Sequence, residues 1–190
     1  ELQGHIPARA LVLSIIAGAT ITKISQVLHH FRVVRVMPNT PARVGKGMSV
    51  WSATDEVSEI QRGQAKAILA ALGEEIYVEH EDELDMATAL SGTGPAYVFL
   101  FMEAMIDAGC ELGLDRETAT TLAMQTGLGA SRMALESDVD LVELRRRVTS
   151  PAGTTERAVQ SFEENGLRAT VTKAMVAAAE RADEMAREMG

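Results

Sequence analysis

The chain has 190 residues and a formal net charge of −9 at pH 7, which disfavours nucleic acid as the main partner because phosphate binding needs a basic surface. Hydrophobic residues make up 46% of the sequence and aromatic residues 4%, so the core must be built from small and aliphatic side chains. A single cysteine, Cys110, excludes an internal disulfide framework, and the longest apolar run, 10–19, is too short to span a bilayer. We expect a soluble, cytoplasmic protein of one large or two small domains.

The first 80 residues alternate between strand and helix patterns, as is typical of an α/β domain. The continuous apolar run 10–16 predicts a strand buried on both faces in a parallel sheet. A tight turn follows, and Thr20 is expected to cap a helix at whose end His29 and His30 carry solvated side chains. Further strands are predicted over 32–37, 47–53 and 75–79, with a helix from Asp55 to Gly73 between the last two.

After residue 80 the strand patterns stop, and the remainder is predicted to be helical. The segment 91–95, Ser-Gly-Thr-Gly-Pro, is expected to break and restart the chain between two helices. The last helix, 167–189, carries an apolar strip suited to a partner helix. So many apolar helical faces exceed what one small bundle would hide, and we infer that this half pairs with a second copy of the chain.

Residues 149–155, Thr-Ser-Pro-Ala-Gly-Thr-Thr, open a helical pattern that runs to Asn165. Proline suits the first turn, and small residues let the backbone approach a ligand closely. The first N–H groups of a helix have no internal partner and lie at the positive end of its dipole, so this start could bind a small anion. An ordinary capped helix start is the alternative.

Two other junctions, 17–20 and 37–41, share this chemistry of Gly, Pro, Ser, Thr and Asn. Both follow predicted strands, at whose carboxyl ends parallel sheets bind ligands. The sequence offers no Ser-His-Asp arrangement and no Cys/His spacing for a metal. The chemistry is therefore one that a cofactor would carry while the protein positions it.

Four motifs occur in order: Val-Met-Pro-Asn-Thr-Pro at 36–41, Thr-Ala-Leu-Ser-Gly-Thr-Gly-Pro-Ala-Tyr at 88–97, Gln-Thr at 125–126, and Val-Thr-Ser-Pro-Ala-Gly-Thr-Thr at 148–155. In this combination the chain resembles pyrroline-5-carboxylate reductases, from about residue 10 onward. The resemblance implies a Rossmann domain for NADPH, followed by an all-α domain through which two subunits interlock, with dimers that can assemble into rings. The implied reaction is hydride transfer from NADPH, or else NADH, to the C=N carbon of 1-pyrroline-5-carboxylate, giving L-proline.

The resemblance also implies site residues. Backbone N–H groups and a hydroxyl would hold the substrate carboxylate, and Glu81 would face the ring nitrogen and orient the protonated imine, so that Glu81 and Thr155 are the implied catalytic residues. The implied substrate-binding residues are Glu81, Ser150, Ala152, Gly153, Thr154 and Thr155. The implied cofactor-binding residues are Ile15, Ile16, Ala17, Met37 and Asn39.

The sequence departs from the family pattern in two ways. Ala152 replaces the first glycine of the more common Pro-Gly-Gly, and no G-x-G-x-x-G fingerprint follows a strand. We therefore expect 1–80 to be the C-terminal portion of an NAD(P)-binding Rossmann domain that lacks its N-terminal half, and 81–190 to be the helical dimerisation and substrate-binding domain. These 190 residues alone are expected to bind NADPH very weakly and to be inactive.

Two alternatives belong to other classes. A non-catalytic helical oligomerisation module is disfavoured by the loop 149–155, because a scaffold needs no anion pocket. Another imine or hydroxy-acid dehydrogenase of similar architecture would place a lysine or aspartate in the helical half, and no lysine lies between Lys66 and Lys173. N–H groups around Gly153 that are already engaged by the protein itself would count against the reductase assignment.

Overall fold

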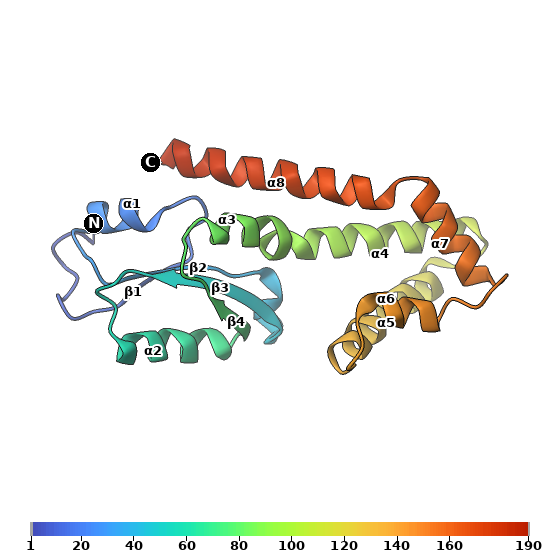
Figure 1. Cartoon of the computed structure of the whole chain (residues 1–190), viewed down its shortest axis with the longest axis horizontal. Helices are drawn as coiled ribbons and strands as arrows, with labels where there is room; N and C mark the ends of the chain where they lie inside the picture. The colour runs from blue at the N-terminus through green and yellow to red at the C-terminus, as the bar shows by residue number, and fades with distance from the viewer. Residues whose placement is uncertain (1, 190) are drawn as a thin grey trace. The chain divides into compact units, whose positions relative to one another are not determined.

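The computed structural model describes residues 2–189 (Figure 1). It forms two compact units: a sheet unit, made of the chain up to Pro95 together with the chain from Lys173 onward, and a helical unit, Ala96–Thr172. The division at residue 80, made by fold class, stays a prediction, because the sheet unit also contains helices that follow this residue.

The sheet unit holds four strands in the order β1-β2-β3-β4: β1 (Val12–Ser14), β2 (Val33–Met37), β3 (Gly47–Ala53) and β4 (Gly73–Tyr77). The predicted strands are all present. The sheet is mixed, because β2 and β3 are antiparallel whereas β1 pairs with β2, and β3 with β4, in parallel. As a result, β1 and β2 end at the same edge of the sheet, and β3 begins there.

The prediction that 10–16 is a strand buried on both faces is wrong. β1 has only three residues, and Ile15 and Ile16, which follow it, are 61% and 59% exposed. β1 pairs with β2 alone and is therefore an edge strand of the described sheet, and the chain leaves the sheet after Ser14. The two isoleucines are presented at the edge instead of being packed inside.

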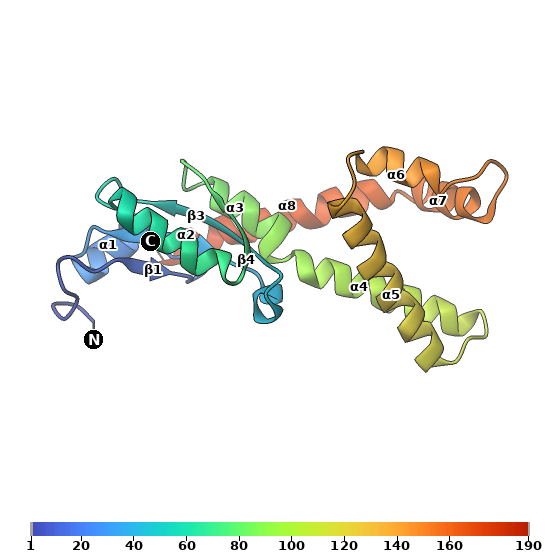
Figure 2. The ribbon, with the colours of Figure 1, turned by 90° about the horizontal axis from the view of Figure 1, so that it is seen from below.

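Helices cover both faces of the sheet (Figures 1 and 2): α2 (Glu59–Ala70) lies on one face, and α1 (Ile21–Leu28) and α3 (Glu83–Ala87) on the other. Thr20 caps α1 as predicted, since its side chain accepts from the N–H of Lys23. The main core lies between the sheet and α2, and its buried members are Val34, Val36, Trp51, Val57, Ala65 and Leu69. A smaller core of Ala19, Ile24 and Val33 lies under α1.

The two histidines after α1 differ in environment. His29 is exposed, as predicted, and ends the helix in the left-handed conformation with φ 49°. His30 is buried, and its Nε2 lies 2.8 Å from the carbonyl oxygen of Ala10, so the prediction of a solvated side chain is wrong for this residue. The ring ties the end of α1 to the segment that leads into β1.

The predicted break at 91–95 is wrong as well. α3 passes through a π-helical turn, η2 (Thr88–Gly92), into α4 (Gly94–Glu111), so that 83–111 is one helix with a widened turn inside it. The N–H of Thr93 donates to the carbonyl of Thr88 at 2.9 Å, five residues back, which is the hydrogen bond of a π turn.

The helical unit contains most of α4 together with α5 (Arg116–Leu135), α6 (Leu141–Arg147) and α7 (Thr154–Glu164), and α8 (Leu167–Met189) begins in it. Figure 2 shows α5 crossing α4. Gly109 allows this close approach, because a Cβ there would lie 3.2 Å from the Cβ of Ala119.

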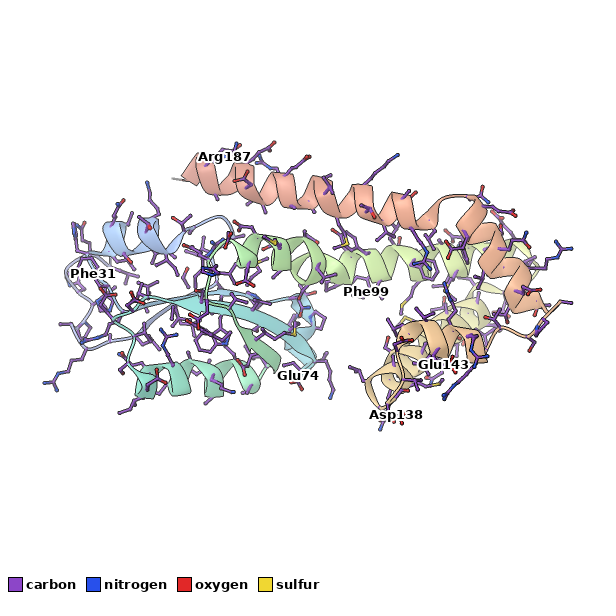
Figure 3. All side chains as sticks on the ribbon, in the orientation of Figure 1. Phe31, Glu74, Phe99, Asp138, Glu143 and Arg187 are labelled. Atoms are coloured by element: carbon purple, nitrogen blue, oxygen red, sulfur yellow. The ribbon has the colours of Figure 1, made fainter. Side chains whose placement is uncertain are left out.

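Little of the helical unit is buried within the chain. Its only buried apolar side chains among the described residues are Ala119 and Ala123, both on α5. Phe99 on α4 is 56% exposed and projects from its helix (Figure 3). By length and composition alone, the helix 83–111 is long and apolar enough to cross a membrane, with a mean hydropathy of 1.2. Only 6% of its most apolar 18-residue stretch is buried within the chain. The unit thus leaves most of its large apolar side chains exposed within this chain.

Candidate active site

The segments expected to contact a cofactor lie together in the sheet unit. β1 and β2 are in parallel register, with Val12 opposite Val33 and Ser14 opposite Arg35, so the chain leaves both strands at the same edge, after Ser14 and after Met37. Gly18 turns the chain back after Ala17 with φ 77°, a conformation that favours glycine. The structure therefore brings the predicted segments 15–17 and 37–39 to one side of the sheet.

A buried arginine occupies the sheet face beneath α3. Arg35 on β2 is 5% exposed, and its Nη1 and Nη2 lie 2.8 Å and 3.1 Å from carboxylate oxygens of Glu81 and Asp85. The same Oε1 of Glu81 also accepts the N–H of Ile21, the first residue of α1, at 2.7 Å. One carboxylate thus ties the start of α1 to the middle of β2, and charged partners make such hydrogen bonds the strong ones.

This arrangement adds a structural role for Glu81 to the expected one, which stays a prediction. The resemblance placed its carboxylate against the ring nitrogen of the substrate, but Oε1 is engaged by two donors of the sheet unit. The side chain is 28% exposed, so it is screened in part from water while it holds α1 in place. The geometry supports a residue that positions the turn between β1 and α1.

Asn39 and Met37 are also engaged by the protein. The Oδ1 of Asn39 accepts the N–H of Met48 on β3 at 2.9 Å, and its Nδ2 donates to the carbonyl of Ser91 at 3.2 Å. The side chain of Met37 lies against Gly92, where a Cβ would meet the Met37 Cε at 2.5 Å. The end of β2 is therefore joined to both β3 and η2.

A cavity of about 170 Å³ lies beside this edge, within the sheet unit. The turn after β1, the turn η2 and the last part of α8 line it, so part of the predicted apolar strip of α8 packs against the chain itself. Its lining residues are Ala17, Gly18, Asp85, Thr88, Thr93, Ala178, Arg181, Ala182 and Met185.

The helix start at 149–155 lies in the helical unit and differs from expectation in two of its N–H groups. The N–H of Ala152 donates to Oε2 of Glu156 at 2.8 Å, and that of Gly153 donates to the carbonyl of Ser150 at 3.0 Å. The prediction that these two N–H groups are open to a ligand is wrong, because the loop closes on itself, and this counts against these two groups as part of a carboxylate site. Ala152 also has φ 57°, which explains why glycine would suit this position.

Two donors of this loop remain open. Within residues 2–189, the N–H groups of Thr154 and Thr155, at the first two positions of α7, have no acceptor. Helix geometry explains this, because the first turn has no carbonyl four residues back inside the helix. The α7 start therefore keeps the anion-binding character of a helix N-terminus at its two threonines.

The neighbouring basic residues of α6 are already neutralised. Hydrogen bonds from Arg146 and Arg147 lower the pKa of Glu143 to about 2 (Glu143 is labelled in Figure 3). Arg145 pairs with Glu163 on α7 at 3.4 Å. The cluster 145–147 is thus a set of surface ion pairs.

Sequence reasoning missed Arg35, Asp85, Ser91 and Glu156. A charged residue inside the apolar strand pattern 32–37 was a signal for a buried ion pair, and a glutamate at the third position of a helix is a signal for a capping contact. Within residues 2–189 no group of three or more His, Cys, Asp or Glu side chains is placed to hold a metal ion.

The model of the family described as pyrroline-5-carboxylate reductase dimerisation matches residues 81–185. The chain belongs to the pyrroline-5-carboxylate reductase family. A pyrroline-5-carboxylate reductase from Pseudomonas aeruginosa is 50% identical over 181 residues, which cover 95% of this chain and 66% of that protein. One from Synechocystis is 39% identical over 180 residues, covering 95% and 67%. The chain thus spans about two thirds of the length of these curated relatives.

Solved structures of the family share the fold. A pyrroline-5-carboxylate reductase from Coxiella burnetii superposes with a TM-score of 0.88 at 45% identity, covering 92% of this chain and 65% of that one. A pyrroline carboxylate reductase from Plasmodium falciparum, solved with NADP bound, gives a TM-score of 0.86 at 36% identity, covering 93% and 71%. The sheet unit and the helical unit of this chain therefore both have counterparts in the reductase family.

Proposed function

We propose that this chain is the part of an NADPH-dependent pyrroline-5-carboxylate reductase that presents the nicotinamide edge and binds the substrate carboxylate. The observation that carries the proposal is the shared edge at which β1 and β2 end, in a chain that belongs to this family. The cofactor would supply a hydride to the C=N carbon of 1-pyrroline-5-carboxylate, giving L-proline, with NADH as the other possible donor.

The residues at the edge fit the nicotinamide end of a dinucleotide. Ile15 and Ile16 expose apolar side chains directly after β1, and Gly18 makes the tight turn that lets the backbone approach a flat ring. Met37 and Asn39 close the edge from β2. The sequence contains no glycine-rich fingerprint after a strand, so we propose that these 190 residues alone bind NADPH very weakly and do not turn over.

Substrate binding is assigned to the start of α7. The open N–H groups of Thr154 and Thr155, with the Thr155 hydroxyl, would hold the substrate carboxylate, and Ser150 and Gly153 would keep the loop in shape. Gly153 has this role because a Cβ there would lie 3.0 Å from the Ser150 carbonyl oxygen. Ala152 would add a third donor when Glu156 moves away. Glu81 is proposed to position α1 and the cofactor turn in addition to its expected role at the imine.

We also propose that the helical unit forms a homodimer, which can assemble further, in the cytoplasm. The exposed apolar side chains of α4 and α5, Phe99 among them, would be covered by a second copy of the unit, and a charged fraction of 24% over the whole chain suits a soluble protein. Light scattering should give at least twice the monomer mass, and Leu128→Glu on α5 should shift it to the monomer, while Arg132→Glu should not. A monomeric parent protein would contradict this assignment.

The decisive experiment is NADPH oxidation with 1-pyrroline-5-carboxylate by the natural full-length protein. Thr155→Val should raise the KM for this substrate about tenfold, because hydrogen bonds to charged groups contribute about 1.5–3 kcal/mol. The KM for NADPH should stay unchanged. Thr170→Val is the matched control, since this exposed helical threonine bonds only its own helix, at the carbonyl of Gly166. Absence of turnover in the parent protein would end the proposal.

A further inference from the structure

The motif 88–97 carries two residues that normally weaken a helix, Gly92 and Pro95, and each has a partner at or just after the end of β2. Pro95 has no N–H and so leaves the carbonyl four residues back, that of Ser91, without its usual donor. The Nδ2 of Asn39 donates to this carbonyl at 3.2 Å. Gly92 has no Cβ, and the Cε of Met37 occupies the space that a Cβ would approach to 2.5 Å.

The contacts are specific to the π turn. Thr93 donates to the carbonyl of Thr88, which widens this part of the helix, and its hydroxyl donates to the carbonyl of Ala89 at 2.9 Å. The backbone N–H and the hydroxyl of Thr93 thus both bond to carbonyls of the same turn. The Ser91 carbonyl and Gly92 instead contact Asn39 and Met37 at the end of β2. π turns are frequent at functional sites, where they re-aim groups.

We infer that the turn η2 is the element that positions the cofactor edge, with Gly92 setting the place of the Met37 side chain and Ser91 that of Asn39. The inference rests on the proposed function in one respect, that the edge at the ends of β1 and β2 binds the cofactor. The contacts of η2 with Met37 and Asn39 do not depend on that function. Asn39 is held at both ends of its amide, by Met48 and by Ser91, so its task is to fix the chain at 37–39. Ser91, Gly92 and Pro95 are positioning residues, because they act through Met37 and Asn39.

The test is Gly92→Ala in the natural full-length protein. The added methyl would meet the far end of a flexible side chain, so the fold should be kept while the Met37 methyl moves. A displacement of about 1 Å near reacting groups can cost about 100-fold in rate, and for a binding contact we expect about a tenfold loss of NADP⁺ affinity. Gly94→Ala is the matched control, because a Cβ there meets nothing within 4 Å.

Three readouts are needed. The Met37 methyl resonance, in protein labelled at methionine methyl groups, should shift in Gly92→Ala and not in Gly94→Ala. Calorimetric titration with NADP⁺ should show the loss of affinity in the first variant only, with the KM for 1-pyrroline-5-carboxylate unchanged. In a Met37→Leu background, which lacks the colliding Cε, Gly92→Ala should cause no further loss.

An unmoved Met37 resonance, unchanged NADP⁺ affinity, or an equal loss in the Met37→Leu background would each overturn the inference. These results are separate from the fate of the proposed function, which depends on turnover of 1-pyrroline-5-carboxylate. The protein could lack that turnover while Gly92→Ala still weakens NADP⁺ binding through Met37. In that case the positioning role of η2 would stand, and the assignment of 1-pyrroline-5-carboxylate as substrate would fall.

Discussion

Replacement of the buried arginine is the most direct test of how the sheet unit is held together. Arg35→Met keeps most of the side-chain length and removes the guanidinium that lies 2.8 Å from Glu81 and 3.1 Å from Asp85. Both carboxylates would then remain near the sheet without a cation. The N–H of Ile21 would keep its acceptor, so the damage should come from uncompensated charge.

The magnitude follows from burial. Removal of one partner of a fully buried ion pair costs about 3–5 kcal/mol. Here the arginine side chain is 6% exposed but the carboxylates are 28% and 27% exposed, so water relieves part of the penalty. Exposed pairs contribute only about 0–1 kcal/mol. Because this arrangement lies between the buried and the exposed case, we expect Arg35→Met to lower the free energy of unfolding by about 2–3 kcal/mol.

Urea unfolding at fixed protein concentration measures this loss. Arg132→Met is the control, because Arg132 pairs with Glu136 at 2.7 Å while their side chains are 76% and 64% exposed, and it should cost less than about 1 kcal/mol. Adding Glu81→Gln and Asp85→Asn to Arg35→Met should restore part of the stability by removing the stranded charges. Equal losses for Arg35→Met and Arg132→Met would show that the buried ion pairs contribute no more to stability than an exposed one.

Three further predictions concern the helical unit. Ala152→Gly should raise the free energy of unfolding by about 0.5–1 kcal/mol, measured in urea, because glycine adopts φ 57° without strain; destabilisation would show that the conformation is not strained. Glu156→Gln should lower the KM for 1-pyrroline-5-carboxylate about two- to fivefold, because it removes an anion that competes for the Ala152 N–H, whereas Glu164→Gln, at the other end of α7, should not. The pKa of Glu143 is lowered to about 2, so its ion pairs with Arg146 and Arg147 should stabilise α6 above pH 4.5 and be lost as the pH falls from 4.5 towards 2. Carbon NMR of the Glu143 carboxyl measures this directly, and a midpoint near 4.5 would contradict the hydrogen bonds.

The secondary structure could largely be predicted because local periodicity determines it. The predicted strand over 47–53 matches β3 to the residue, and the cap at Thr20 follows from a side chain next to its own helix. The run 10–16 was misjudged for a tertiary reason. Its composition fits a buried strand, but burial depends on neighbours on both sides, and β1 has one neighbouring strand in the described sheet.

The candidate site was predicted as segments rather than as contacts. The motifs identify 15–17, 37–39 and 149–155, and the parallel pairing of β1 and β2 brings the first two to one edge. The bonds of Arg35 join residues 46 and 50 positions apart, which no local pattern can specify. Glu156 lies only four residues from Ala152. Its carboxylate accepts the Ala152 N–H because Ala152 has a positive φ, and composition does not predict this backbone angle.

The segment 91–95 shows why a correct local rule can fail. Glycine and proline each weaken a helix, and the sequence offers two glycines and a proline within four residues, so a break is the sound local prediction. The structure keeps the helix because the defects are complemented from a distance: Asn39 supplies the donor that Pro95 lacks, and Met37 fills the space that Gly92 leaves. Substitutions on the two motifs should therefore be non-additive. In urea unfolding, Asn39→Ala should cost less when Pro95→Ala has already given the Ser91 carbonyl a donor within the helix, and the cost that remains should be that of the lost Met48 contact.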